Sequence, residues 1–309
     1  MNKGRILITA PAHPILEEKL RSHGYEVFVK PDVSYSELEN DLEDVIGLVV
    51  TTRITIDRNI IDKAGKLQWI GRLGSGMELI DTAYASQKNI QCISTPEGNR
   101  NAVAEHALAL TLCLMNKVCS SFAEVKNGKW LRRENSGIEL SGKKVGIIGF
   151  GNTGSSFARL LEPFNVDVLV YDKYKKDFTN HYIRESSLEE IQSEAKIISL
   201  HVPLTAETFH MINDDFFTAL KQRPFFITTC RGAVTDSKAL ISALKNNLVS
   251  GAALDVLENE KLSSFSDEEK NEFDFLCMQS NVIITPHIAG YTDEAFLKMA
   301  TVLLSRLGL

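Results

Sequence analysis

Residues 144–154 read Lys-Val-Gly-Ile-Ile-Gly-Phe-Gly-Asn-Thr-Gly, an apolar run that leads directly into the pattern G-x-G-x-x-G. The apolar run predicts a buried β-strand, and the residues after the second glycine of the pattern predict the start of a helix. In such a unit Gly149 permits a tight turn, Gly151 lets a ligand approach the backbone, and Gly154 lets the helix pack closely on the strand. The stretch therefore predicts a doubly wound α/β module that binds a nucleotide.

A carboxylate follows this motif at the expected distance. Asp172 ends the next apolar run, 168–172, about 20 residues after the glycines, as dinucleotide-binding modules require. It can accept hydrogen bonds from both ribose hydroxyls of NAD and would repel the additional phosphate of NADP. Asn152 and Thr153 open the intervening helix, whose free N–H groups attract phosphate. We therefore expect NAD as the cofactor, although the glycine pattern alone also fits FAD, another nucleotide or a plain glycine turn.

The same alternation of strand and helix signals extends along the chain. Expected strands are 5–10, 27–29, 46–51, 69–73, 144–149, 166–171, 196–200, 225–229, 251–255 and 282–285, and expected helices are 14–22, 101–115, 153–161 and 292–304. Such alternation predicts parallel sheets, and its restart after 101–115 predicts two doubly wound domains. Asn165 is expected to adopt the left-handed conformation in the turn before 166–171. The acidic stretch 263–275 is expected to be a surface loop that can include a helical turn.

Length and composition limit the class of protein. The chain has 309 residues, of which 44% are hydrophobic and 24% charged, as in globular proteins with two domains. A net charge of -6 argues against nucleic acid or acidic lipid as a partner. Five scattered cysteines without C-x-x-C argue against a disulfide framework or a metal site. Because no apolar run is long enough for a signal peptide or a membrane span, we expect a cytoplasmic protein without a membrane partner.

Longer blocks of sequence surround the glycine motif and the later strand ends. They are Trp130 with 137–151, 200–208, and 230–234 with 251–256, Glu260 and 285–290; weaker blocks lie at 71–81 and 102–106. Together they resemble the D-isomer-specific 2-hydroxyacid dehydrogenases over nearly the whole chain. The resemblance implies two Rossmann-like domains, with a cofactor domain of residues 101–287 inserted into a substrate domain of residues 1–100 and 288–309. It also implies a homodimer.

The resemblance assigns a catalytic group to Arg231, Glu260 and His287. Each follows a predicted strand, at the sheet edge where ligands bind in this fold. Arg231 would hold the substrate carboxylate with its planar donors, and His287 would exchange the hydroxyl proton. Glu260 would fix the imidazole tautomer and favour its protonated form. Lys261 stands where the family often has Pro, which leaves Glu258 as a competing choice for the carboxylate. The spacing of 29 residues between Arg231 and Glu260 favours Glu260.

Further contacts are implied by the same comparison. Val103, Cys230 and Asp255 are expected near the nicotinamide, His201, Pro203 and Thr208 on the adenosine side, and the backbone of Ser75, Gly76 and Met77 at the substrate carboxylate. Simple packing would explain Val103 and Pro203 as well. Arg53 and Arg132 resemble basic residues near the substrate phosphate of 3-phosphoglycerate dehydrogenases, with a solvated basic turn as the alternative.

The function implied is the transfer of a hydride between nicotinamide and a small D-2-hydroxy acid or its 2-keto acid. A form similar to 3-phosphoglycerate dehydrogenase is the first candidate, without the regulatory domain of longer members, since none follows Leu309. Glu78 and Leu79 stand where many relatives carry Asp-Asn, so glyoxylate and hydroxypyruvate stay open as substrates. An NAD(H)-sensing regulator similar to a corepressor is the alternative from another class. A third alternative is a protein that binds NAD without turnover. Formate oxidation is disfavoured, because formate enzymes of this family carry Gln in place of the residue that corresponds to Glu260.

Overall fold

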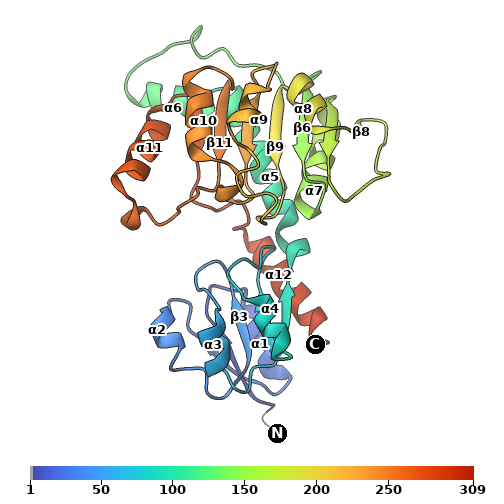
Figure 1. The fold of residues 1–309 in the computed structure, drawn as a ribbon, viewed down its shortest axis with the longest axis vertical. Helices are drawn as coiled ribbons and strands as arrows, with labels where there is room; N and C mark the ends of the chain where they lie inside the picture. Colours follow the sequence, from blue (N-terminus) through green and yellow to red (C-terminus); the bar gives the residue numbers. More distant parts are fainter. Residues whose placement is uncertain (1–2) are drawn as a thin grey trace. The chain divides into compact units, whose positions relative to one another are not determined.

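A computed structural model describes residues 3–309, which divide into two compact units. The first unit comprises Met1–Ala102 and Gly290–Leu309, and the second comprises Val103–Ala289. The sequence predicts boundaries at 100/101 and 287/288, and the units divide two residues later in each case. In Figure 1 the red helix α12 (Asp293–Arg306) lies among the blue and cyan elements of the first unit.

The first unit is built on a parallel five-stranded sheet of order β2-β1-β3-β4-β5. The strands are β1 (Arg5–Ile8), β2 (Glu26–Val29), β3 (Val45–Val50), β4 (Trp69–Arg72) and β5 (Gln91–Ser94). Helices α1 (Pro14–Ser22) and α12 cover one face, and α2 (Tyr35–Leu38), α3 (Arg58–Lys63) and α4 (Thr82–Gln87) cover the other. Side chains alternate between the faces, so Ile6 and Ile8 pack toward α1 and α12 while Leu7 packs toward the opposite helices.

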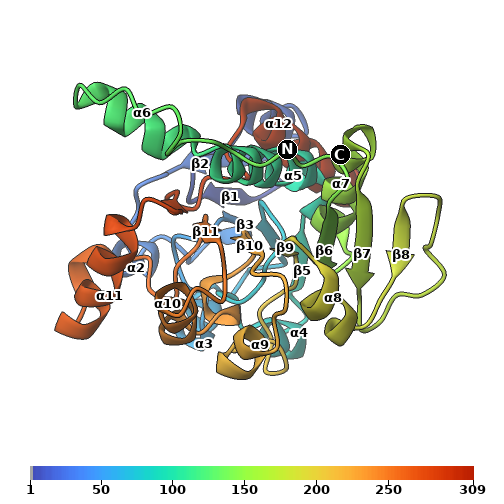
Figure 2. The same ribbon diagram turned by 90° about the horizontal axis from the view of Figure 1, so that it is seen from above.

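The second unit is built on a parallel seven-stranded sheet of order β12-β11-β10-β9-β6-β7-β8. The strands are β6 (Lys144–Ile148), β7 (Asp167–Tyr171), β8 (Ile183–Glu185), β9 (Ile197–Leu200), β10 (Phe225–Thr228), β11 (Gly251–Leu254) and β12 (Val282–Ile284). The strand order reverses at β6, between β9 and β7, which is where such sheets bind ligands. Figure 2 shows β8 at the outer edge of this sheet. The two parallel sheets confirm the predicted α/β class.

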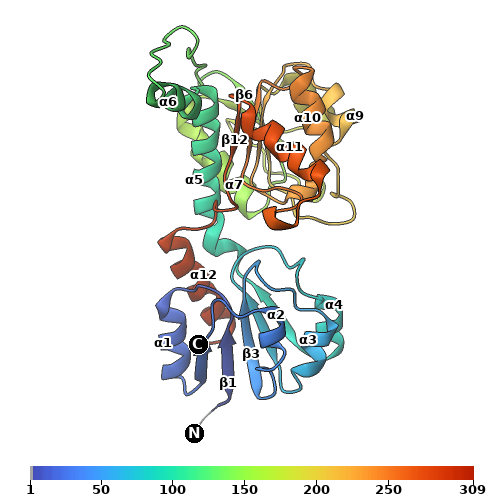
Figure 3. The same cartoon turned by 90° about the vertical axis from the view of Figure 1, so that its left-hand side faces the viewer.

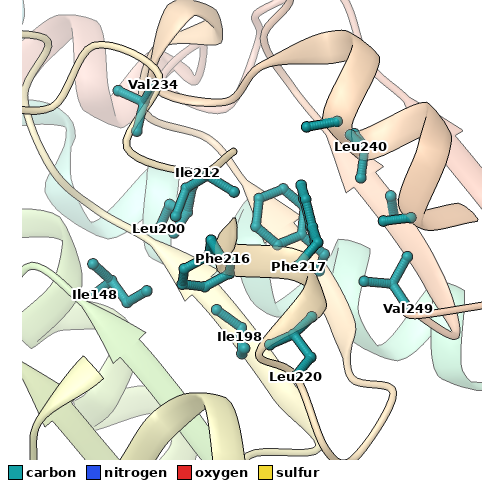
Figure 4. Packing of buried hydrophobic residues seen from close by; sticks show 14 of the residues in the cluster. Ile148, Ile198, Leu200, Ile212, Phe216, Phe217, Leu220, Val234, Leu240 and Val249 are labelled. Carbon is teal, nitrogen blue, oxygen red and sulfur yellow. The ribbon is translucent and has the colours of Figure 1, made fainter. Parts of the chain in front are cut away.

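Helices cover both faces of the second sheet. Helices α5 (Pro96–Met115) and α7 (Asn152–Leu161) cover one face, and α8 (Leu188–Glu194), α9 (Asp214–Thr218), α10 (Ser237–Lys245) and α11 (Asp267–Met278) cover the other (Figure 3). Figure 4 shows Phe216 and Phe217 of α9 packed with Ile198 and Leu200 of β9 and with Leu240 of α10. Apolar side chains therefore cover both faces of the sheet.

Two local expectations have opposite outcomes. Asn165 has a φ of 54°, which confirms the left-handed turn before β7. The expected loop 263–275 is wrong, because helix α11 begins at Asp267. Ser266 and Glu269 form a reciprocal capping box at its start, and the buried Leu276 anchors the helix to the core.

No single helix among the described residues is both long and apolar enough to cross a bilayer. By length and composition alone, only α5 together with α6 (Val118–Lys126) passes this test, and that pair is bent by 60°.

Candidate active site

The glycine loop has the geometry that a dinucleotide requires. Gly149 has a φ of +97°, and a Cβ there would lie 2.5 Å from the carbonyl oxygen of His201. A Cβ at Gly154 would lie 2.0 Å from the carbonyl oxygen of Gly149, so this glycine permits the close contact of α7 with the loop. A Cβ at Gly151, in contrast, would meet nothing within 4 Å. Open space thus lies beside Gly151, directly before α7. The N–H groups of the first turn of α7, which begins with Asn152 and Thr153, can bind a pyrophosphate.

Asp172 lies directly after β7 and is bound to the glycine loop. Its carboxylate accepts hydrogen bonds from the backbone N–H groups of Phe150 (2.7 Å), Tyr174 (2.9 Å) and Lys175 (2.9 Å). Partial burial raises the pKa of Asp172, but these donors and the charge of Lys175 outweigh it and leave the pKa below its ordinary value. Because each carboxylate oxygen has two lone pairs, these three bonds leave one lone pair, on Oδ2, for a ribose hydroxyl.

Replacement of Asp172 by Ala is expected to weaken NADH binding and to reduce any preference for NADH over NADPH. Losing a hydrogen bond to a charged acceptor costs about ten- to hundredfold in affinity, and NADPH would escape the charge repulsion. Fluorescence titration with both cofactors measures the ratio. Asp177→Asn, an exposed carboxylate of the same segment with a φ of 61°, should leave that ratio unchanged. An unchanged ratio in Asp172→Ala would contradict the assignment.

The segment after β9 lies beside the glycine loop. His201 is buried, its Nε2 lies 2.9 Å from Ser199 Oγ, and its ring packs on Phe157 at 5.3 Å. Burial lowers the pKa of His201 to about 3, so this imidazole is neutral and packs next to the glycine loop. Thr208 donates to the carbonyl oxygen of Pro203 at 2.6 Å and so closes the turn expected on the adenosine side.

Strands β10, β11 and β12 end at the same level of the sheet. Thr228 pairs with Leu254, and Leu254 pairs with Ile284. Arg231 and His287 therefore lie at the same edge on the two sides of β11, and each follows the end of its own strand by three residues. The functional residues expected after these strands are thus collected at one edge of the second sheet, together with the glycine loop after β6.

The structure pairs Glu260, and not Glu258, with His287. Glu260 Oε2 lies 2.8 Å from His287 Nδ1. Glu258 is engaged elsewhere, because its Oε2 lies 2.7 Å from His210 Nε2 and its Oε1 accepts from the N–H of Ser237 at 2.8 Å. An ionised Glu260 requires Nδ1 of a neutral His287 to carry the proton. Nε2 of His287 is then the ring atom that can accept a proton.

Arg231 lies in the loop after β10 and is half-buried. Its Nη1 donates to the carbonyl oxygen of Cys230 at 2.6 Å. The next residue, Gly232, touches the loop after β11 so closely that a Cβ would lie 1.9 Å from the carbonyl oxygen of Leu257. The loops that carry Arg231 and Glu260 are therefore in contact. Burial raises the pKa of the Cys230 thiol, so this residue, which directly precedes Arg231, is neutral.

Asp255, expected beside the nicotinamide, is buried and holds the loop that carries His287. Its Oδ1 accepts from the Thr285 hydroxyl at 2.6 Å and from the N–H of Ile288 at 2.9 Å, and its Oδ2 accepts from the N–H of Ala289 at 2.9 Å. Its carbonyl oxygen accepts from the N–H of His287 at 2.8 Å. These bonds fix a loop in which His287 has a φ of 56°, a conformation that costs about 1–3 kcal/mol for a residue with a side chain.

The remaining predicted residues lie apart from this group along the chain. Ser75, Gly76 and Met77 follow β4 in the first unit, and Val103 is a buried residue of α5. The Arg53 guanidinium is held by its own unit, since it donates to the carbonyl oxygens of Pro31 and Val33 and lies 3.6 Å from Asp32. Arg132 is exposed between α6 and β6. Among residues 3–309, no cluster of three or more His, Cys, Asp or Glu side chains is arranged to hold a metal ion.

Comparison with known proteins identifies the class that this site defines. Residues 108–289 match the profile of the D-isomer specific 2-hydroxyacid dehydrogenase, NAD binding domain. The chain therefore belongs to the D-isomer-specific 2-hydroxyacid dehydrogenase family and carries its NAD-binding domain.

Individual relatives carry different names. D-3-phosphoglycerate dehydrogenase of Archaeoglobus fulgidus is 34% identical over 297 residues, which cover 94% of this chain and 55% of that protein. Glyoxylate reductase of Pyrococcus furiosus is 33% identical over 295 residues, which cover 93% and 84% of the two chains. The solved structure of D-lactate dehydrogenase from Aquifex aeolicus complexed with NAD and lactic acid is 29% identical, with a TM-score of 0.85 and coverage of 98% and 95%. The chain spans about half the length of the phosphoglycerate dehydrogenases that it matches.

Proposed function

We propose that this protein is an NAD-dependent oxidoreductase that transfers a hydride between nicotinamide and a small D-2-hydroxy acid or the matching 2-keto acid. The observation that carries this proposal is the hydrogen-bonded pair Glu260–His287 at the same sheet edge as the glycine loop. A dinucleotide would be held by the loop from Gly149 to Gly154, with Asp172 at its ribose. Bound NAD would supply the hydride chemistry.

The residues after β10, β11 and β12 would transfer the proton of the substrate and bind its charged carboxylate. Nε2 of His287 takes the proton of the substrate hydroxyl during oxidation and returns it during reduction. Glu260 stabilises the resulting imidazolium through its charge and holds the ring by Nδ1. The planar guanidinium of Arg231 binds the substrate carboxylate and orients it. In the first unit, the backbone of Ser75, Gly76 and Met77 is proposed as a further hydrogen-bond donor to the substrate.

For the substrate, D-3-phosphoglycerate with phosphohydroxypyruvate is the first candidate. The name of the Archaeoglobus relative and the exposed basic side chain of Arg132 support it. Glyoxylate or hydroxypyruvate is the second candidate. It is favoured by the Pyrococcus glyoxylate reductase, which matches over more of its length, and by the contacts that already occupy the Arg53 guanidinium.

A reductase assay separates these possibilities. NADH absorbance is followed with phosphohydroxypyruvate, hydroxypyruvate, glyoxylate and pyruvate, and NADPH is tested in parallel. Preference for phosphohydroxypyruvate, reduced by Arg132→Ala, would support the phosphate-binding role of that arginine. Preference for an unphosphorylated acid would support the dehydrogenase activity and contradict a phosphate-binding role for Arg132. Inactivity on every acid with NADH still bound would contradict the proposed activity and favour an NAD(H)-sensing protein.

We further propose that the protein is a homodimer that covers the apolar side of α6. This helix buries none of its own side chains, and Val118, Phe122 and Val125 recur on it at helical spacing while remaining exposed. Phe122 is 64% exposed, and Trp130, in the segment that follows, is 73% exposed. Such a cluster of exposed apolar side chains is typical of a protein–protein interface.

Replacement of Phe122 by Glu is expected to yield monomers, because the new carboxylate would have to be buried without a partner. Light scattering coupled to size-exclusion chromatography measures the mass of the particle against the 34.4 kDa of one chain. Met278→Glu, a matched change at an exposed residue of α11, should leave the mass unchanged. A monomeric wild type, or a Phe122→Glu variant that remains dimeric, would contradict the interface.

A further inference from the structure

A second histidine lies beside the catalytic loop, and the mechanism above does not use it. His106 belongs to α5, and its Nε2 lies 3.1 Å from the Thr285 hydroxyl oxygen and 3.5 Å from Asp255 Oδ1. His106 is separated from Thr285 by most of the second unit along the chain. Its side chain is 21% exposed, whereas that of Asp255 is fully buried. The imidazole therefore partly covers a buried carboxylate.

The direction of each hydrogen bond follows from the chemistry of the three groups. Asp255 can only accept while it is ionised, so the Thr285 hydroxyl donates to its Oδ1 over the short distance of 2.6 Å. The Thr285 oxygen then has only lone pairs left and must accept from His106. His106 Nε2 accordingly carries a proton that points to Thr285, and this fixes the imidazole tautomer.

The chain of bonds continues to His287. Asp255 binds the loop through the Thr285 hydroxyl and the N–H groups of Ile288 and Ala289, which flank His287 on both sides. The strained φ of His287 persists only while these bonds hold it. A change at His106 would free the Thr285 hydroxyl to rotate away from Asp255 and would loosen one end of this loop. The direction in which His287 Nε2 points is therefore sensitive to His106.

We propose that His106 is a positioning residue that orients His287 through the Thr285 hydroxyl and the Asp255 carboxylate. This inference rests on the proposed function, in which His287 exchanges the proton. Helix α5 begins in the first unit and continues past Ala102 into the second, with His106 in its next turn. The bond to Thr285 thus links the catalytic loop to the helix that joins the two units.

Steady-state kinetics on the holoenzyme test the proposal. His106→Ala is expected to lower kcat about tenfold, the effect of losing one partly buried hydrogen bond, with little change in KM for the acid or in the dissociation constant of NADH. His106→Gln retains an N–H donor at a similar reach and should restore most of kcat. Equal impairment in the Ala and Gln variants, or a loss of NADH affinity parallel to that of kcat, would overturn the positioning role.

A double-mutant cycle with Thr285 distinguishes this pathway from general destabilisation. Thr285→Val removes the hydroxyl, and Thr285→Ser keeps it as the matched control. If His106 acts through this hydroxyl, adding His106→Ala to Thr285→Val should reduce kcat no further. Additive losses would show that His106 acts by another route.

Imidazole NMR gives a readout that does not depend on turnover. The protein has seven histidines, so the ring resonances can be assigned by single replacements. We expect His106 in the tautomer with a proton on Nε2, and we expect the His287 resonances to shift in both His106→Ala and Thr285→Val. Those of the exposed His181 should stay in place. Should the wild type reduce none of the acids, the proposed function fails, and the NMR result still decides the inference: unshifted His287 resonances would overturn it.

Discussion

Replacement of His287 by Asn is expected to lower kcat by about 10²- to 10⁴-fold, the usual contribution of a general acid–base group. Asn adopts positive φ values readily, so it can replace His287 at its φ of 56° without additional strain. Its amide can still donate to Glu260 but cannot take up a proton near neutral pH. Binding of NADH, measured by fluorescence, should stay close to that of the wild type because the glycine loop is unaffected.

His210 offers a matched control for this experiment. It is also a histidine with positive φ, 48°, and it also binds a carboxylate, with Nε2 at 2.7 Å from Glu258 Oε2. His210→Asn therefore makes the same chemical and conformational change at a position outside the proposed mechanism. Its kcat should stay close to that of the wild type. A His287→Asn variant that retained turnover within about tenfold of the wild type would refute the assignment of the acid–base group.

The predictable parts of this protein are those that a short stretch of sequence determines locally. The run 144–154 contains its own strand, turn and helix start. Gly149 and Gly154 each have a steric reason that appears in the structure, whereas a Cβ at Gly151 would meet only open space. The residues expected after β10, β11 and β12 could be placed at one edge because parallel strands all end on the same side of a sheet. For the carboxylate beside His287, the spacing of 29 residues from Arg231 favours Glu260 over Glu258, and the bond between Glu260 and His287 agrees with that choice.

The missed features depend on contacts between distant residues or on a signal that was overlooked. The proposed positioning role of His106 rests on its bond to Thr285, and no local sequence pattern connects these two residues. Asp255 was expected near the nicotinamide, and the sequence did not reveal that its buried carboxylate also holds the loop after β12. Helix α11 was predictable: Ser266 followed three positions later by Glu269 is a capping signature, which the acidic composition of the stretch concealed.

Replacement of Gly232 by Ala is expected to lower kcat/KM about a hundredfold, although Gly232 itself carries no functional group. A Cβ there would lie 1.9 Å from the Leu257 carbonyl oxygen and 2.4 Å from the Glu258 nitrogen. These are backbone atoms, so no side chain can rotate away, and the loops that carry Arg231 and Glu260 must separate. A displacement of about 1 Å in a catalytic group can cost about a hundredfold in rate.

The control separates this displacement from the mere addition of a methyl group. A Cβ at Gly65 would meet nothing within 4 Å, so Gly65→Ala should retain the wild-type kcat/KM and melting temperature. Gly232→Ala should melt at a lower temperature, since overpacking costs about 1–3 kcal/mol, and should retain most of its affinity for NADH because the glycine loop lies after a different strand. Since the strain falls between Arg231 and Glu260, both KM for the acid and kcat should change. Wild-type kinetics in Gly232→Ala would mean that the two loops are not held together in solution, and the arrangement of Arg231 beside the Glu260–His287 pair would then need to be revised.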